Sequence, residues 1–253
     1  MPFTPAHPAL ILPLLRPWHR HLSATALVLG AMSPDFEYFL RLRPDGIYGH
    51  TLAGVFWLDL PLILAFAWLF HRLVKLPLAQ SLPDVLRKRL LPLVGPAWPL
   101  RRLVSGPVLA GALLGCASHI VWDWFTHDDG LMVLNCPFLQ QTLPGFGQGW
   151  PLYTFLQYGS TFVGLGSIVW YVLRLPARPT SPPPPTRTRF TFWLATAAVL
   201  VLLWGPFMLY SAHIWPFDAN SVLVTGMSAG LVGMLVAAGT LRRRLAPPPA
   251  VFP

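Results

Sequence analysis

The order of apolar and polar residues along the chain predicts helices that cross a membrane. A hydrocarbon core about 30 Å thick requires a helix of roughly 20 predominantly apolar residues. Five stretches reach this length with few charges, and each is expected to span: residues 50–72, 105–125, 152–173, 190–212 and 219–241. The pattern therefore favours an all-α fold, a polytopic helical bundle of five to six spans.

The chain before the first long apolar stretch is less regular. Pro8 to Leu15 and Leu22 to Ser33 are apolar but short, and at about 1.5 Å per residue neither crosses a membrane alone. One interpretation is a re-entrant helical hairpin with two short arms. The other is a single span over 22–40 that breaks at Pro34, where the ring and the missing N–H interrupt a helix. We favour the hairpin.

Composition supports the membrane interpretation. Apolar residues make up 54% of the 253 residues and charged residues only 11%, a poor fit to a water-soluble domain. A net charge of +9 raises the question of a nucleic-acid partner. The cations, however, lie in the connections between apolar stretches, so we expect contact with membrane lipids and no nucleic acid. The oligomeric state cannot be deduced from the sequence.

The distribution of Lys and Arg predicts the orientation. All but Arg41 and Arg43 fall in segments that alternate to one side of the predicted bundle. The positive-inside rule assigns that side to the cytoplasm, in a membrane that the chain crosses several times. The cytoplasmic segments are then 73–104, 174–189 and the C-terminal Arg242 to Arg244, and the outer loops are 41–49, 126–151 and 213–218.

A proline-rich segment divides the chain. Residues 175–189 read LPARPTSPPPPTRTR, which predicts an extended cytoplasmic linker. We expect a membrane-embedded domain over 1–174, this linker, and two C-terminal transmembrane helices within 190–245. Nearly all polar residues inside apolar stretches precede the linker, so a functional site is expected in the first domain.

The stretch SHIVWDWFTHDDG, at the end of the second predicted span, carries unusual polarity. His119, Asp123 and His127 are spaced by four residues, and each step of four turns a helix by about 40°, which places the three side chains on one face. Imidazole nitrogen and carboxylate oxygen are ordinary zinc ligands. Asp128 and Asp129 extend this cluster toward the predicted outer loop.

Further ligand-type residues lie at the same predicted side of the membrane. His7 occurs in TPAHPA, Asp35 in MSPDFEYFL and His50 in DGIYGHTLAG, and these segments also offer Glu37 and Asp45. If the hairpin forms, its arms bring His7 and Asp35 back to one level. The sequence therefore predicts that a shared site includes residues from the first fifty positions.

Each of these residues also has a simpler interpretation. Asp35 follows Ser33 and Pro34, a good helix start in which the carboxylate faces the first turn. His119 and Asp123 are suited to an ion pair between helices. His50 and His127 are suited to a helix end in water. The conjunction of about six such side chains at one face, in a chain with few charges, favours a metal site. Asp59 lies deeper in its span, and we expect it to pair with another helix.

The motifs together resemble a known family. The segments TPAH, MSPDFEYFL, GHT with LDLP, SHIVWDWFTHDDG and PLYTFLQYGS look like the family of bacterial membrane proteins called domain of unknown function 4184. The resemblance covers residues 1 to about 172. More distantly, the order of ligand-type residues is similar to membrane proteins described as metal-dependent hydrolases, and to the zinc-dependent phospholipase C and S1/P1 nuclease group.

The distant resemblance implies a ligand set and a chemistry. In that group such residues hold a cluster of zinc ions that activates water against a phosphodiester. Those enzymes also use a free amino group at an N-terminal tryptophan and a His-x3-Glu pair, and neither is found here, so one or two metals are expected. Carried over, the implied ligands are His7, Asp35, His50, His119, Asp123 and His127.

The sequence thus leaves several functions open. The first is a membrane-embedded, zinc-dependent hydrolase that acts on a phosphoester of a lipid or lipid-linked substrate at the extracytoplasmic face. There Asp35, Asp128 or Asp129 would accept the proton. The second is a metal-binding or ion-transporting membrane protein without hydrolysis, and a third is a scaffold whose polar cluster only ties helices together. A transporter should carry polar groups deeper into the membrane, and only Asp59 lies that deep.

Overall fold

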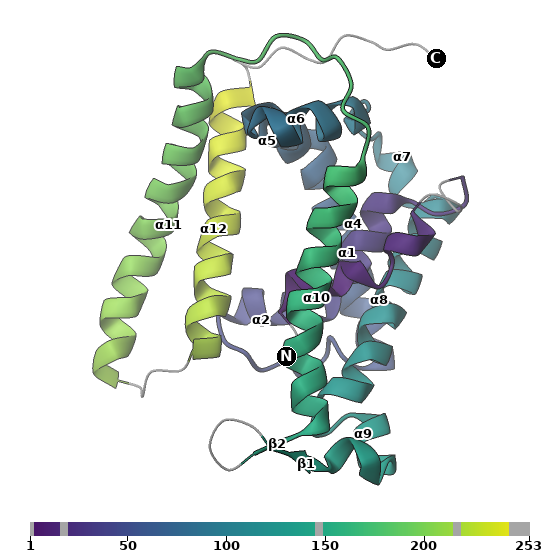
Figure 1. The fold of residues 1–253 in the computed structure, drawn as a ribbon. Coiled ribbons are helices and arrows are strands. Elements are labelled where there is room, and N and C mark those ends of the chain that lie inside the picture. The colour runs from purple at the N-terminus through teal and green to yellow at the C-terminus, as the bar shows by residue number, and fades with distance from the viewer. Residues whose placement is uncertain (1–2, 16–19, 145–148, 215–218, 243–253) are drawn as a thin grey trace. The chain divides into compact units, whose positions relative to one another are not determined.

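The fold is mostly helical, as the apolar pattern predicts. The computed structural model describes residues 3–15, 20–144, 149–214 and 219–242 (Figure 1). Two short strands, β1 (Thr142–Leu143) and β2 (Trp150–Pro151), form an antiparallel ribbon in which Thr142 pairs with Pro151. The all-α class is confirmed.

Four helices are long and apolar enough to cross a membrane. They are Leu52–Ser81, Gly106–Thr126, Thr186–Tyr210 and Ala219–Leu241, and they coincide with four of the five predicted spans. The fifth, residues 152–173, forms helix α10 (Leu152–Arg174) but is not among these four. Polar residues such as Gln157 and Thr161 interrupt its apolar character. Its role as a span stays a prediction.

The described chain forms two compact units. The first contains the described residues of Met1–Phe36, Ile47–Ala67 and Leu100–Tyr171, and the second those of Glu37–Gly46, Trp68–Pro99 and Val172–Pro253. The C-terminal helices thus share a unit with segments from the middle of the chain. The predicted domain boundaries at 174 and 190 stay a prediction.

The first unit contains both arms of the predicted hairpin. Its elements up to residue 67 are short 3-10 helices, short α-helices and the start of the first long apolar helix: η1 (Thr4–Ala9), η2 (Leu12–Leu14), α1 (Ala24–Gly30), η3 (Ser33–Asp35), α3 (Leu52–Gly54), the π-helical η4 (Val55–Asp59) and α4 (Leu60–Leu69). Its later elements are α7 (Leu100–Leu103), α8 (Gly106–Thr126), α9 (Leu131–Asn135), η7 (Pro137–Gln140), the β-ribbon and most of α10.

The re-entrant hairpin stays a prediction, although the local structure of its two arms is described. Two short arms are present, but the first consists of 3-10 turns, in keeping with Pro5, Pro8 and Pro13, which cannot donate backbone hydrogen bonds. The helix of the second arm, α1, ends at Gly30, before Pro34. Residues 22–40 are therefore not one continuous helix. Whether the arms dip into a membrane stays a prediction.

Small residues bring α1 and α8 into close contact. Gly111 and Gly115 lie one turn apart on α8, the spacing that lets helix backbones approach. A Cβ atom on Gly111 would lie 2.9 Å from the Ser23 carbonyl oxygen, and one on Gly115 would lie 2.7 Å from the Ala31 nitrogen. This packing sets the position of the turn after α1 against α8.

The π-helical η4 buries an acidic residue. Asp59 ends this segment, and its Oδ2 lies 3.6 Å from the Cys116 thiol of α8, which in turn lies 3.1 Å from the Ser33 hydroxyl. All three side chains are buried. The expectation that Asp59 pairs with another helix is confirmed.

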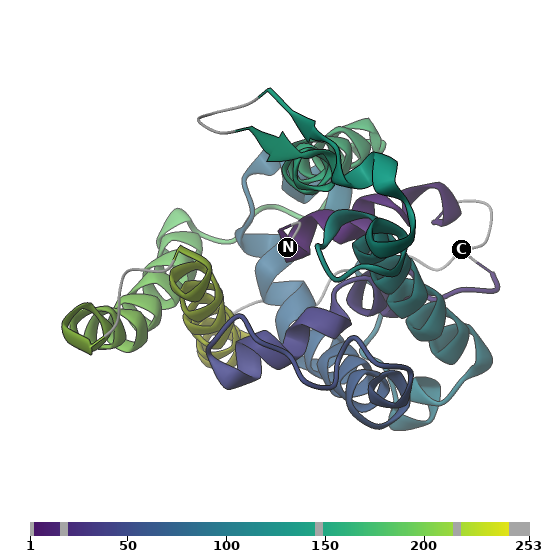
Figure 2. The same ribbon diagram turned by 90° about the horizontal axis from the view of Figure 1, so that it is seen from below.

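The second unit is built around the last two long helices. Its elements are α2 (Phe36–Arg41), the π-helical η5 (Phe70–Val74), α5 (Lys75–Ser81), α6 (Asp84–Leu90), η6 (Leu91–Leu93), α11 (Thr186–Ile214) and α12 (Ala219–Leu241). Helices α11 and α12 run side by side in both views (Figures 1 and 2). Phe192 and Ala237 are fully buried between them and η5.

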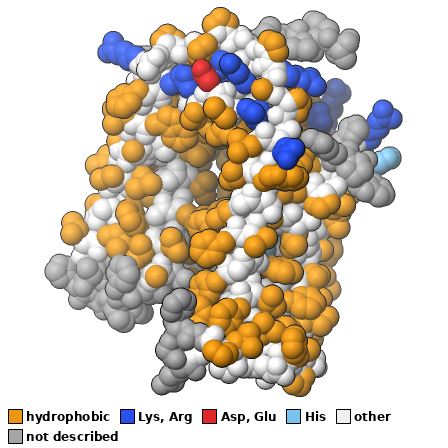
Figure 3. Space-filling view, viewed as in Figure 1, with side chains coloured by type: hydrophobic (Ala, Val, Ile, Leu, Met, Phe, Trp, Pro, Cys, Tyr) orange, Lys and Arg blue, Asp and Glu red, His pale blue; other side chains and the backbone are white. Residues whose placement is uncertain are grey.

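Basic side chains gather around α6 and the segment before α11 (Figure 3). The Arg178 nitrogen donates to the Lys88 carbonyl over 3.0 Å, and the Arg189 guanidinium donates to the Leu82 carbonyl over 2.7 Å. Parts of the segments 73–104 and 174–189 are therefore in contact, and their place on one side of a membrane stays a prediction. Helix α11 begins at Thr186, inside the predicted linker. The predicted orientation also involves Arg16, Arg243, Arg244 and loop residues 215–218, which lie outside the described residues.

Candidate metal centre

Helix α8 supplies the central pair of the site. His119 and Asp123 are one turn apart, and the His119 Nε2 lies 3.2 Å from the Asp123 Oδ2. The His119 ring is fully buried. Its Nδ1 donates a hydrogen bond to the Ala31 carbonyl oxygen over 2.9 Å. Because a carbonyl only accepts, this bond leaves Nε2 as the nitrogen with a lone pair, directed at the carboxylates.

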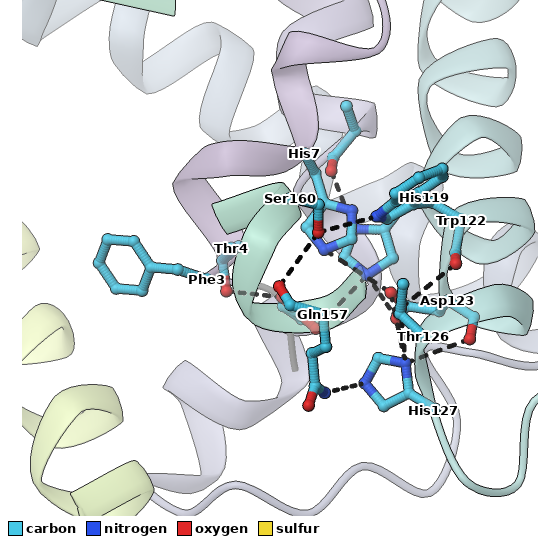
Figure 4. Close-up of polar contacts among 12 residues, drawn as sticks. Phe3, Thr4, His7, His119, Trp122, Asp123, Thr126, His127, Gln157 and Ser160 are labelled. Carbon is cyan, nitrogen blue, oxygen red and sulfur yellow. Dashed lines mark hydrogen bonds and ion pairs between the residues drawn. The ribbon is translucent and has the colours of Figure 1, made fainter. Parts of the chain in front are cut away.

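His7 stacks on His119. The two ring centroids are 3.7 Å apart and the ring planes differ by 11° (Figure 4). The His7 Nε2 lies 3.7 Å from the Asp123 Oδ1. The η1 turn that carries His7 is held against α10, where the Phe3 nitrogen donates to the Thr161 hydroxyl over 3.1 Å. The segment from Phe3 to His7 thus helps to form the site.

Asp35 enters from the other arm. The Thr4 hydroxyl donates to its Oδ2 over 2.5 Å, and its Oδ1 lies 3.5 Å from the His119 Nε2. The expected helix start is wrong in detail: Met32, not Ser33, precedes the first turn, and the Ser33 hydroxyl donates to the Gly30 carbonyl. The Asp35 carboxylate is therefore oriented by Thr4 and faces the histidines.

His50 joins the cluster from the loop before α3. Its Nε2 lies 3.3 Å from the Asp123 Oδ2 and 3.6 Å from the Asp35 Oδ1. The preceding Gly49 touches the Pro34 backbone, where a Cβ atom would overlap the Pro34 carbonyl. The His50 side chain is 30% exposed, whereas those of His7, Asp35 and His119 are at most 1% exposed. Water therefore reaches the cluster from the His50 side.

These five residues suit a metal ion. Two overlapping sets, His7 with His119 and Asp123, and Asp35 with His50 and His119, each have ligand atoms within 4.8 Å of one another. Several of these atoms are buried and lack a hydrogen-bond partner in the described structure: both His7 ring nitrogens, Asp35 Oδ1, His119 Nε2 and Asp123 Oδ1. Buried polar atoms without partners are costly unless a ligand satisfies them. Three imidazoles and two carboxylates are the donor set of zinc or a similar divalent ion.

Burial favours the neutral form of His7 and His127. Burial, together with the neighbouring His119, lowers the pKa of His7 to about 3, although Asp123 and Asp35 oppose this shift. Burial also lowers the pKa of His127. A neutral imidazole has a free lone pair, the form in which histidine binds a metal. His7 is therefore available as a ligand at neutral pH.

His127 lies beside the cluster and not in either of the two sets. The helix ends at Thr126, and His127 has an extended backbone, which corrects the expectation that it continues the helical face. Its Nδ1 bonds to the Asp123 carbonyl over 3.2 Å, and its Nε2 lies 3.5 Å from the Gln157 amide nitrogen (Figure 4). Both ring nitrogens therefore face protein groups, although Nδ1 also lies 3.5 Å from the Asp123 Oδ1.

The remaining acidic candidates lie apart from the five. Asp128 and Asp129 are exposed on the turn after α8, and the Asp128 carboxylate accepts a bond from the Asp129 nitrogen. Glu37 pairs with Arg41 and Asp45 with Arg43, both in the second unit.

The sequence interpretation missed the groups that orient the ligands. Thr4 was visible in TPAH, three residues before His7, but nothing in the sequence links it to Asp35. The Ala31 carbonyl and the Gln157 amide are likewise found only through tertiary contacts. The small residues Gly111 and Gly115 were the available signal that another helix lies close to α8.

The fold and site define a helical protein with four helices long and apolar enough to cross a membrane and a buried His/Asp cluster that could hold a metal ion. The family model described as Domain of unknown function (DUF4184) matches residues 1–239, and the chain belongs to this family. The match extends past the expected limit near residue 172 and includes most of α12. No curated protein and no solved structure matches the chain.

Proposed function

We propose that this protein is a membrane-embedded, metal-dependent hydrolase. Membrane insertion is supported by the exterior of the four long helices. In Thr186–Tyr210 only 11% of the most apolar window is buried, and Leu202 and Leu209 are each 71% exposed. Large exposed apolar surfaces of this kind require a covering, and lipid fits helices of this length.

The observation that carries the proposal is the buried cluster of His7, Asp35, His50, His119 and Asp123. Its ligand atoms converge, and several have no hydrogen-bond partner among the described residues. Thr4 and the Ala31 carbonyl orient the side chains of Asp35 and His119. Hydrogen bonds from the protein to the ligating side chains are typical of metal sites, because they fix the tautomer of a histidine and the direction of each ligand. Zinc is the favoured ion on ligand type.

The exposure of His50 supports catalysis over a structural role. Structural zinc sites are closed by protein ligands, whereas catalytic sites leave a position for water or substrate. A divalent ion held by these residues would supply Lewis acidity, lowering the pKa of water and polarising a phosphoryl oxygen. The protein's own part is to orient the ligands, exclude water on the His7 side and admit it beside His50.

A carboxylate must accept the proton that water loses. Asp35 is the candidate inside the cluster, and its Oδ1 is buried with no hydrogen-bond partner in the described residues. Asp128 and Asp129 are candidates in the exposed turn after α8, on the same side of the cluster as His127. Asp35 fits better, because a general base must lie within hydrogen-bond reach of the reacting water.

The substrate we propose is a phosphoester of a lipid or lipid-linked molecule. The site lies in a unit whose long helices suit a membrane, so the nearest abundant phosphoesters are lipid headgroups. We place the protein in the cytoplasmic membrane of a bacterium, with the site on the extracytoplasmic side and the basic segments 73–104 and 174–189 inside. The contact between Arg178 and Lys88 supports a common side for the two segments.

Metal content and hydrolysis of the purified protein test the proposal. We expect about one or two transition-metal ions per chain, and release of phosphate or headgroup from mixed micelles that contain phospholipids and lipid-linked phosphates. His119→Ala and Asp123→Ala should lose both. His21→Ala, which alters an exposed histidine outside the cluster, should keep both. A metal-free wild-type protein, or hydrolysis that survives His119→Ala, would contradict the proposal.

One observation favours a second candidate, a metal transporter without hydrolysis. About one turn before His119 on α8, Cys116 contacts both Asp59 and Ser33. Polar groups therefore continue from the cluster into the long apolar helices. A permeation path needs such a ladder of polar groups. Zinc flux into proteoliposomes that falls in both His119→Ala and Asp59→Asn, with no hydrolysis by the wild type, would favour transport.

A further inference from the structure

An apolar groove adjoins the metal cluster at His7, and its lining does not include His50. It has a volume of about 440 Å³ and is formed by η1, the end of α8 and the first half of α10. Its lining includes Ala6, His7, Leu10, Trp122, Gly159 and Val163. All of these residues belong to the first unit. His7 is thus shared between the groove and the candidate metal centre.

Two polar side chains of the groove wall, those of Trp122 and Ser160, are hydrogen-bonded to the protein. The Trp122 indole nitrogen donates to the Ser160 hydroxyl over 3.3 Å, and that hydroxyl donates to the Gln157 carbonyl over 3.0 Å (Figure 4). The groove wall is therefore mostly hydrocarbon, with no free donor at Trp122. A polar ligand would lose its contacts with water there, whereas an apolar chain would gain from burial.

Two glycines on α10 create the groove in different ways. Gly164 lets η1 approach, because a Cβ atom there would lie 2.9 Å from the Ala6 carbonyl oxygen. Gly159 lines the groove, and a Cβ atom there would meet no atom within 4 Å. The space beside Gly159 is therefore open and can be filled by a side chain without displacing the backbone.

We propose that this groove binds the hydrocarbon chain of a phospholipid whose phosphate lies at the metal cluster. The two neighbouring surfaces differ in chemistry as the two parts of such a molecule do. A His/Asp cluster that holds a divalent cation attracts an anionic phosphate, and the groove next to it takes an apolar chain. Leu10 and Val163 at the groove are 42% and 69% exposed, so the chain can enter from the surrounding lipid.

The inference rests on the proposed function for the position of the phosphate, but chain binding can be measured without turnover. The probe is phosphatidic acid with a diazirine in one acyl chain, added to the full-length, metal-loaded protein in phosphatidylcholine nanodiscs. After illumination, mass spectrometry locates the labelled peptides. Wild-type protein should be labelled on η1 and α10, at or near Leu10 and Val163.

A matched pair of variants tests the groove itself. Gly159→Leu fills the open space, whereas Gly166→Leu makes the same change on α10, outside the groove, where a Cβ atom also meets nothing within 4 Å. Gly159→Leu should lower groove labelling roughly tenfold, the effect of losing burial of about two methylene groups. Gly166→Leu should label like the wild type, and both variants should retain their metal.

The outcomes separate this inference from the proposed function. Groove labelling without hydrolysis of any phosphoester supports the groove and contradicts the hydrolase. Hydrolysis that persists in Gly159→Leu, with equal labelling of the two variants, overturns the groove and leaves the hydrolase standing. Absent labelling together with a monomer–dimer shift in Gly159→Leu also overturns it, because a second copy of the chain would then occupy the groove.

Discussion

The Nδ1 atom of His119 donates to the carbonyl oxygen of Ala31 over 2.9 Å, and this one bond joins the core of the site to the turn after α1. The bond selects the tautomer in which Nε2 faces Asp123 and Asp35. It forms only because α1 and α8 pack closely enough to bring a backbone carbonyl to a fully buried ring. The site's chemistry is therefore coupled to the packing of two helices.

That coupling predicts the effect of a larger residue at Gly115. Gly115→Val would force apart the Leu27 and Ala31 backbone and the α8 helix, and overpacking of this kind costs about 1–3 kcal/mol or more. We expect a lower thermal unfolding temperature and loss of bound metal together. Gly166→Val, on an open face of α10, should leave both nearly unchanged. Full metal binding in Gly115→Val would show that the helix contact does not position His119.

The Thr4 hydroxyl offers a narrower test of ligand orientation. Thr4→Val removes the hydrogen bond to the Asp35 Oδ2 while keeping the side-chain shape. Loss of a hydrogen bond that orients a metal ligand lowers metal affinity by about 10–100-fold. Thr4→Ser retains the hydroxyl and should bind metal nearly as tightly as the wild type. Competition with a fluorescent zinc chelator measures both affinities. Equal affinity in Thr4→Val would mean that Asp35 is oriented by other groups.

His127 distinguishes a centre of five ligands from one of six. Because its ring nitrogens face the Asp123 carbonyl and the Gln157 amide, we expect His127→Ala to retain metal with affinity reduced by about tenfold or less. Asp123→Ala, which removes a carboxylate from the cluster, should lose metal altogether. Metal analysis after gel filtration separates the two results. Stoichiometric loss in His127→Ala would restore it as a sixth ligand.

Removal of the metal should destabilise the folded protein. A ligand at 100 times its dissociation constant stabilises the state that binds it by about 2.7 kcal/mol, so a strong chelator should lower the unfolding temperature of the wild type. The buried carboxylates of Asp35 and Asp123 would then face each other with only histidines to compensate them. His119→Ala, expected to be metal-free, should unfold at the same temperature with and without chelator. A wild type that does not respond would contradict a tightly bound ion.

Much of the fold follows from local pattern. Runs of about 20 apolar residues predict long helices because a helix satisfies its own backbone in an apolar surrounding. Four of the five predicted runs are helices of the expected length and apolarity. The first arm was less predictable. Its prolines interrupt helical hydrogen bonding, and its 3-10 turns depend on contacts with α10.

The candidate ligands illustrate the same division. The spacing of His119 and Asp123 places them on one helix face from sequence alone, whereas His127 required the end of the helix to be known. His7, Asp35 and His50 are ligand types in suggestive motifs, but their convergence depends on the approach of three segments distant in sequence. Gly49 against Pro34 is one such contact.

The sequence by itself determined the helical class, the long apolar segments and the identity of the candidate ligands, because these depend on side-chain chemistry and on spacing within one element. Only the tertiary structure decided which ligand atoms converge, which ring nitrogen of His119 is free, that His127 turns toward Gln157, and that an apolar groove adjoins His7. These features arise from contacts between residues tens of positions apart, and the local pattern of hydrophobic and polar residues carries no record of them.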